Sequence, residues 1–210
     1  MRPGLKDIYR KLFDHYGPQY WWPADSEFEV MIGAILTQNT SWTNVEKAVK
    51  NIKDQKVLGP RKLYRLSEKR LARLIRPSGY YNLKSRRIRN FLDFFIKGHR
   101  ASAKRMSRAA TGALREQLLS VKGIGPETAD SILLYALDKP VFVVDAYTKR
   151  IFSRHKVFPG DSEYHSVQGI FMRGLPKDVG LFKEYHALIV RLAKDFCLKN
   201  NPKCQICPLK

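Results

Sequence analysis

The chain has 210 residues, and its 39 lysines and arginines against 19 acidic residues give a formal net charge of +20. This charge favours a polyanionic partner, because clustered cations release condensed counterions when they meet phosphates. The 44% share of hydrophobic residues excludes a disordered basic tail, and no apolar run approaches the roughly 18 residues of a membrane span. Since no secretory signal is seen, we expect a cytoplasmic, nucleoid-associated protein without a membrane partner.

Apolar residues recur at three- and four-residue spacing along nearly the whole chain, which predicts an all-α fold of about ten helices. The expected helices cover residues 5–16, 27–36, 42–52, 68–75, 82–97, 112–121, 126–137, 146–155, 162–173 and 178–196. The residues expected to cap helix N-termini are Ser26, Ser41, Ser67, Thr111 and Asp145. Residues 140–144 are expected to be extended and buried.

The most informative segment joins two expected helices through Gly123, Ile124 and Gly125, with Lys122 in front. Two glycines permit a tight turn and leave backbone N–H groups open to a phosphate, and the next helix adds its positive end. A helix–helix turn without a ligand would have the same pattern. The segment alone is therefore compatible with two interpretations, a purely structural turn and a phosphate-binding site.

Downstream of this turn, the apolar run 141–144 ends in Asp145 at an expected helix start. With residues 35–40 (ILTQNT) and 79–85 (GYYNLKS), this order of motifs resembles the helix-hairpin-helix DNA glycosylases of the endonuclease III superfamily. The resemblance covers nearly the whole chain, from Glu27 to Cys207. It implies a hairpin at 122–125 that grips DNA backbone, a glutamine (Gln38) that fills the gap in the duplex, and a catalytic carboxylate (Asp145).

The resemblance also implies an architecture and a partner. We expect a six-helix barrel lobe over residues 25–138, containing the helix-hairpin-helix. A second helical lobe would combine residues 1–24 with 139–210, and a cleft would separate the two lobes. The expected partner of this monomer is double-stranded DNA containing a damaged base.

The chemistry of glycosidic bond cleavage suits a carboxylate at position 145. Breaking an N-glycosidic bond leaves positive charge on the sugar, which a fixed carboxylate stabilises while it orients the attacking water. As a plain N-cap, Asp145 would contribute only about 1 kcal/mol. In lyase members of the family, a lysine two residues after the second glycine attacks the sugar. Glu127 occupies that position here, so we expect a monofunctional glycosylase; Glu127 could line the pocket or only favour the helix start.

The aromatic segment 20–23 (YWWP) and Trp42 resemble the 3-methyladenine branch of the family. Trp22, Pro23 and Trp42 are the candidates for stacking on an extruded base, and core packing is the alternative, above all for Trp21. A cationic alkylated purine suits electron-rich rings. Lys194 matches a lysine that faces the pocket in that branch, but a solvated lysine is the favoured interpretation of this position. The alternative functions are a glycosylase for deaminated or mismatched bases and a damage-binding module without catalysis.

All three cysteines lie near the C-terminus, as Cys197, Cys204 and Cys207. An odd, clustered set without a secretory signal favours a metal site over disulfides. The spacing matches the first three ligands of the family's [4Fe–4S] loop, and the fourth would fall three residues beyond Lys210. Three thiolates could instead bind a cluster with a foreign fourth ligand, bind zinc, or stay free. The basic runs 84–89 and 97–108 are expected to face DNA backbone in part.

Overall fold

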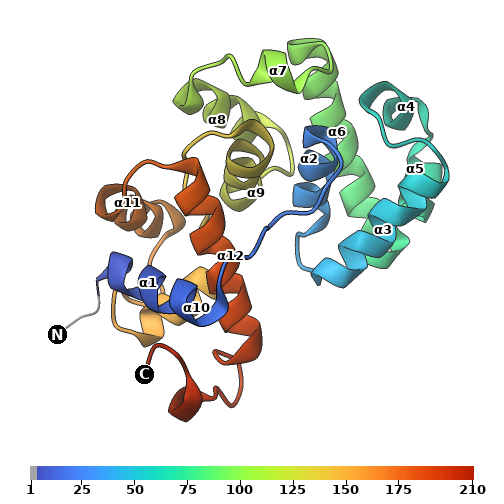
Figure 1. The fold of residues 1–210 in the computed structure, drawn as a ribbon. Coiled ribbons are helices and arrows are strands. Elements are labelled where there is room, and N and C mark those ends of the chain that lie inside the picture. Colours follow the sequence, from blue (N-terminus) through green and yellow to red (C-terminus); the bar gives the residue numbers. More distant parts are fainter. Residues whose placement is uncertain (1–3) are drawn as a thin grey trace. The chain divides into compact units, whose positions relative to one another are not determined.

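The computed structural model describes residues 4–210, and it contains helices and no strand within that range (Figure 1). The predicted all-α class is therefore confirmed. Two compact units make up the chain: unit 1 comprises Met1–Pro23 and Pro140–Lys210, and unit 2 comprises Ala24–Lys139. Among the described helices, none combines the length and apolar character needed to cross a membrane.

Unit 2 is built around one helix that is buried on every side. The elements of this unit are α2 (Glu27–Leu36), α3 (Trp42–Asp54), α4 (Pro60–Arg65), α5 (Glu68–Leu74), η1 (Arg76–Ser78), α6 (Tyr81–His99), α7 (Ala103–Met106), α8 (Thr111–Ser120), α9 (Pro126–Ser131) and η2 (Ile132–Ala136). Every residue of α2 from Phe28 to Leu36 is buried, and α2 packs against α3, α6, α9 and η2. A helix that is apolar all round is stable only in such a central position.

Unit 1 joins the two ends of the chain around helix α12. Its elements are α1 (Leu5–Tyr16), α10 (Ala146–Arg154), α11 (Tyr164–Gly174), α12 (Val179–Asp195) and η3 (Cys204–Ile206), and α12 packs against α1 and α10 (Figure 1). The core holds stacked and edge-on rings, with Phe142 and Phe171 at a centroid distance of 4.1 Å. The Tyr185 hydroxyl donates to the Leu5 carbonyl at 2.7 Å, and the Gln19 N–H donates to Glu184 at 2.7 Å.

Some local predictions from the sequence were wrong. The helices α4 and α7 were not predicted, because six and four residues are too few for a helical period to register. Thr111 is the first residue of α8 and Ala110 is its N-cap, without a side-chain bond. The helix predicted for 126–137 changes into a π-helical turn at Ile132. Ser26, Ser67 and Asp145 do cap their helices with side-chain hydrogen bonds.

Candidate active site and DNA interface

The glycine turn between α8 and α9, residues 121–125, is here called the hairpin. Gly123 has a φ of +98°, and a Cβ at this position would clash with Cγ of Arg87, so both backbone and packing require glycine. Ile124 is buried and anchors the turn, and its N–H donates to the Val121 carbonyl at 2.9 Å. Gly125 is exposed, has an ordinary φ, and has open space where a Cβ would stand. Neither the backbone conformation nor the packing of the core therefore requires a glycine at position 125.

Gln38 lies against the hairpin within unit 2. Its Nε2 donates to the Gly123 carbonyl at 3.2 Å and to the Thr128 hydroxyl at 2.9 Å. Its Oε1 accepts a hydrogen bond from NH1 of Arg87. Two of the predicted DNA contacts, Gln38 and Gly123, are therefore brought together. In this structure the carboxamide is held at both ends, so its insertion into a duplex would require these bonds to break.

Lys84, which the sequence places in a basic run facing DNA, is instead buried. Its ammonium donates to the Leu36 carbonyl at 2.9 Å and to the Ser78 carbonyl at 2.6 Å, which satisfies the end of α2 and the turn before α6. Burial, and then the charge of nearby Arg87, lower the pKa of Lys84 to about 8. This lysine is structural, because a side chain with 1% exposure is not available to a phosphate.

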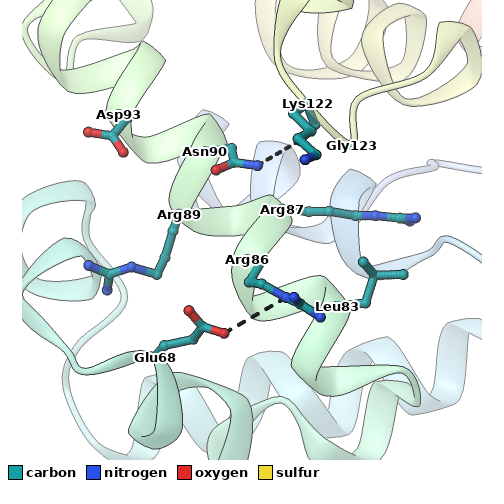
Figure 2. A pocket seen from close by; sticks show the side chains of 9 residues that line it. All are labelled: Glu68, Leu83, Arg86, Arg87, Arg89, Asn90, Asp93, Lys122 and Gly123. Atoms are coloured by element: carbon teal, nitrogen blue, oxygen red, sulfur yellow. Dashed lines mark hydrogen bonds and ion pairs between the residues drawn. The ribbon is translucent and has the colours of Figure 1, made fainter.

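A basic pocket of 540 Å³ opens beside the hairpin in unit 2 (Figure 2). Its lining residues are Glu68, Leu83, Arg86, Arg87, Arg89, Asn90, Asp93, Lys122 and Gly123. Asn90 donates to the Lys122 carbonyl at 2.9 Å, which fixes the hairpin to α6. Four cationic and two acidic side chains leave an excess of positive charge, and such a surface suits the DNA backbone.

Asp145 is the N-cap of α10 and is almost fully buried in unit 1, with 9% exposure. The buried segment 141–144, which belongs to no helix, delivers it to this position. Its Oδ1 accepts the Thr148 N–H at 2.6 Å and the Thr148 hydroxyl at 2.8 Å, and its Oδ2 lies 3.4 Å from Nε2 of His186. Burial alone would raise the pKa of Asp145, but the contacts with His186 and Thr148 outweigh it and lower the pKa below its ordinary value. The capping function and a stable negative charge therefore coexist in one side chain.

The predicted base-binding residues are distributed over both units. In unit 1, Trp22 is half-buried, Pro23 is exposed, and exposed Lys194 has its Nζ 5.7 Å from the ring centroid of Trp21. In unit 2, half-buried Trp42 donates its indole N–H to Glu46 at 2.8 Å.

Glu127 is an exposed acid in the first turn of α9. A carboxylate in the first turn of a helix is favoured by the helix dipole. Lys122, on the hairpin, is exposed as well.

The cysteines occupy three different environments at the end of unit 1. Cys197 is buried, Cys207 is half-buried and Cys204 is exposed. Within residues 4–210, no three histidine, cysteine or acidic side chains gather in a way that could hold a metal ion. Burial raises the pKa of the Cys207 thiol, and the nearby Cys197 and Cys204 raise it further. As placed, these residues do not fit a cluster, and the predicted [4Fe–4S] group stays a prediction from spacing.

Two arginines of α10 hold the start of this cysteine segment. Nε of Arg150 donates to the Cys197 carbonyl at 2.8 Å. Arg154 donates to Sγ of Cys197 at 3.3 Å and to the carbonyls of Leu198 and Lys199 at 2.7 and 2.9 Å. The segment after α12 is thus fixed to α10 by guanidinium groups.

Sequence reasoning missed the partners of the predicted residues. Thr148 follows Asp145 by three residues, which is the capping register and could have been noticed. His186 and Arg87 lie far along the chain from Asp145 and Gln38, and no local pattern identifies them.

The chain matches the HhH-GPD superfamily, whose members are base excision DNA repair proteins, over residues 32–177. A Methanocaldococcus jannaschii protein named "Putative DNA repair glycosylase MJ1434" is 50% identical over 97% of this chain and 92% of its own length. The crystal structure of H. pylori 3-methyladenine DNA glycosylase bound to 1,N6-ethenoadenine is 29% identical, with a TM-score of 0.80, and the match covers 91% of this chain and 98% of that one.

The fold is also shared with a non-covalent endonuclease III–DNA complex, at a TM-score of 0.83 and 20% identity over 98% of this chain and 91% of that one. Because the family match spans more than half of the chain and the archaeal relative is similar along almost all of it, the chain belongs to the HhH-GPD superfamily of base excision DNA repair proteins, a family of DNA glycosylases.

Proposed function

We propose that this protein is a monofunctional DNA glycosylase that hydrolyses the N-glycosidic bond of alkylated purines in double-stranded DNA, acting as a monomer. The observation that carries the proposal is Asp145, a buried carboxylate whose pKa lies below its ordinary value. A module that only binds DNA does not need a buried, negatively charged carboxylate, which is costly to desolvate. A glycosylase needs one to stabilise the developing sugar cation.

The proposed reaction uses the carboxylate in two ways. As the bond between sugar and base lengthens, the negative charge of Asp145 stabilises the positive charge on the sugar. The same group orients a water molecule for attack on the anomeric carbon, and the base leaves. A purine that carries an alkyl group on a ring nitrogen is already cationic, so its glycosidic bond is weak and little acid catalysis is needed.

The monofunctional character rests on Glu127. A glutamate stands where lyase relatives place the lysine that forms an imine, and a carboxylate cannot form one. Water is then the nucleophile, and the product is an abasic site in an intact strand.

The substrate class rests on the aromatic residues and on one similarity. Trp22 and Trp42 offer ring faces to a cationic base, with Pro23 and Lys194 as further candidates for contact with it. The H. pylori protein, 29% identical to this chain, bears the name of a 3-methyladenine glycosylase. For the DNA contacts, we propose Lys122, Gly123, Ile124 and Gly125 on the backbone, with Gln38 released from the hairpin into the duplex.

The test is a base-release assay on duplexes that carry one lesion each: an alkylated purine, an ethenoadenine, a uracil and a mismatched thymine. We expect release from the alkylated purine, and release slower by orders of magnitude in Asp145→Asn, a variant that keeps an acceptor for the cap of α10. Release only from the uracil or mismatched-thymine duplexes would show that the substrates are deaminated or mismatched bases and not alkylated purines. Wild-type rates in Asp145→Asn would refute the catalytic role.

A further inference from the structure

The two oxygens of the Asp145 carboxylate have different surroundings. Oδ1 accepts both the N–H and the hydroxyl of Thr148, so it is committed to capping α10. Oδ2 has His186 beside it, with Nε2 at 3.4 Å. Thr148 is only three residues away on the same helix, whereas His186 belongs to α12. The orientation of Oδ2 therefore depends on a second helix.

The position of His186 is fixed by the core of unit 1. Its side chain is 8% exposed and that of Asp145 is 11% exposed, and α10 packs directly on α12. The neighbouring Tyr185 has its ring 6.1 Å from that of Phe152 on α10, centroid to centroid. The imidazole is thus held in place before any DNA is bound.

A second contact matters because one contact cannot fix a carboxylate. The group rotates about the bond between Cβ and Cγ, and the bonds at Oδ1 alone leave the plane free to tilt. A buried carboxylate without compensation also tends to take up a proton. Apart from burial, the largest influences on the pKa of this carboxyl come from His186 and Thr148.

We propose that His186 is a positioning residue of the glycosylase, which holds the plane of the Asp145 carboxylate through Oδ2 and stabilises its negative charge. This inference rests on the proposed catalytic role of Asp145. His186 itself touches neither the sugar nor the base in this assignment; it acts through the carboxylate.

The experiment measures single-turnover excision by the whole chain, on whichever lesion duplex the wild type releases a base from. His186→Leu removes the polar contact and keeps much of the volume. We expect a maximal rate about 10- to 100-fold lower, as for other groups that orient a functional side chain. The duplex concentration at half-saturation stays unchanged, and the acidic limb of the pH–rate profile moves to higher pH.

A conservative variant separates positioning from packing. His186→Gln places an amide N–H near the position of Nε2 without a ring that can carry charge. We expect His186→Gln to restore most of the excision rate at neutral pH, while the acidic limb of its pH–rate profile stays shifted to higher pH. His165→Leu, which changes an exposed histidine on α11, is the matched control and should leave both unchanged.

Several outcomes overturn the inference. One is a wild-type rate and acidic limb in His186→Leu. Another is an equal loss of excision rate in His186→Leu and His186→Gln with an unshifted acidic limb of the pH–rate profile. This result would indicate that His186 contributes only to packing. If circular dichroism shows that His186→Leu does not fold, the acidic limb of His186→Gln decides, and an unshifted limb refutes the proposal.

The double variant separates this inference from the proposed function. If Asp145→Asn excises as well as the wild type, the catalytic assignment fails first. If Asp145→Asn loses most of its excision rate and His186→Leu is unaffected, only the role of His186 fails. Added to Asp145→Asn, His186→Leu should not lower the residual excision rate further, and an additional loss would mean that His186 acts independently of the carboxylate.

Discussion

Arg115 and Asp130 form a two-pronged ion pair that joins the two helices of the hairpin. Nε of Arg115 lies 2.7 Å from Oδ1 of Asp130, and NH2 lies 3.0 Å from Oδ2. Asp130 is fully buried on α9, and the Arg115 side chain on α8 is 14% exposed. Such parallel bonds restrict orientation as well as distance, so this pair fixes how α8 enters the turn and how α9 leaves it.

Removing one partner of this pair should be costly. In Asp130→Ala the guanidinium loses the Asp130 carboxylate in a largely dry environment, and we expect the free energy of unfolding to fall by about 3–5 kcal/mol. Urea denaturation measures this. Asp54→Ala, which breaks the exposed pair with Lys50 in the same unit, is the control and should cost less than about 1 kcal/mol. Equal losses in the two variants would contradict the prediction.

The two glycines of the hairpin should respond differently to alanine. Gly123→Ala forces a Cβ onto Arg87 at a positive φ, so we expect a loss of at least about 1 kcal/mol of stability. Gly125→Ala meets open space and should leave stability unchanged while weakening duplex binding, since its methyl group occupies the surface offered to phosphate. Thermal unfolding and fluorescence anisotropy measure the two effects. A Gly125→Ala protein with wild-type affinity would show that phosphates do not approach there.

Lys84 predicts a specific pH dependence of stability. The unfolded lysine keeps its proton up to its ordinary pKa of 10.5, and the folded one releases it near a pKa of 8. Between these values the unfolded state binds more protons, so stability rises with pH, by at most about 1.4 kcal/mol per pH unit. We expect this rise in the wild type relative to Lys84→Met.

At neutral pH, Lys84→Met should itself be less stable by at least about 1 kcal/mol, because two carbonyls lose their donor. Denaturant titrations on either side of pH 8 measure both effects. Lys47→Met, at an exposed position of α3, is the control and should keep the pH dependence of the wild type. If the stability of Lys84→Met still rises with pH as in the wild type, another group causes the pH dependence.

Because Glu127 replaces an amine, no covalent adduct with DNA is expected. Borohydride added during excision should trap no protein–DNA complex, and strand breaks should appear only after heat or alkali. Glu127→Gln, which also lacks an amine, should behave in the same way. An efficiently trapped adduct would contradict the prediction, and Lys122 and Lys194 would then be replaced first.

The indole of Trp42 should contribute to excision by stacking. Loss of one stacked ring costs about 1–3 kcal/mol, so Trp42→Ala should lower excision about tenfold or more, with unchanged binding of undamaged duplex. Trp42→Phe keeps a ring face although it loses the exposed bond to Glu46, so it should retain most activity. If Trp22→Ala and Trp42→Ala both excise normally, other residues bind the base.

The longer helices could be predicted from the sequence because their apolar stripes repeat over several turns. The bounds of α1 agree with the predicted 5–16, and Ser26, Ser67 and Asp145 cap as expected. Short helices such as α4 and α7 escaped prediction. The π-helical turn at Ile132 also escaped, because its residues are as apolar as those of an α-helix and only packing distinguishes the two.

The candidate site was predictable to the extent that its residues lie in local motifs. The hairpin glycines and Asp145 are of this kind. Lys84 was misassigned, because a lysine in a run of basic residues gives no sign that two carbonyls bury it. The cysteine spacing predicted a cluster, but spacing along the chain does not determine whether side chains converge, and in residues 4–210 they do not form a metal-holding group.

Unit 1 is discontinuous in sequence, and this determines the order in which the protein can fold as it is synthesised. Helix α1 leaves the ribosome before unit 2, but the α12 residues that it packs against are made after unit 2. Unit 2 is one uninterrupted segment and can acquire its buried α2 core while unit 1 is still incomplete. The apolar side chains Ile8 and Leu12 therefore lack their partners on α12 until unit 2 and then α12 have emerged.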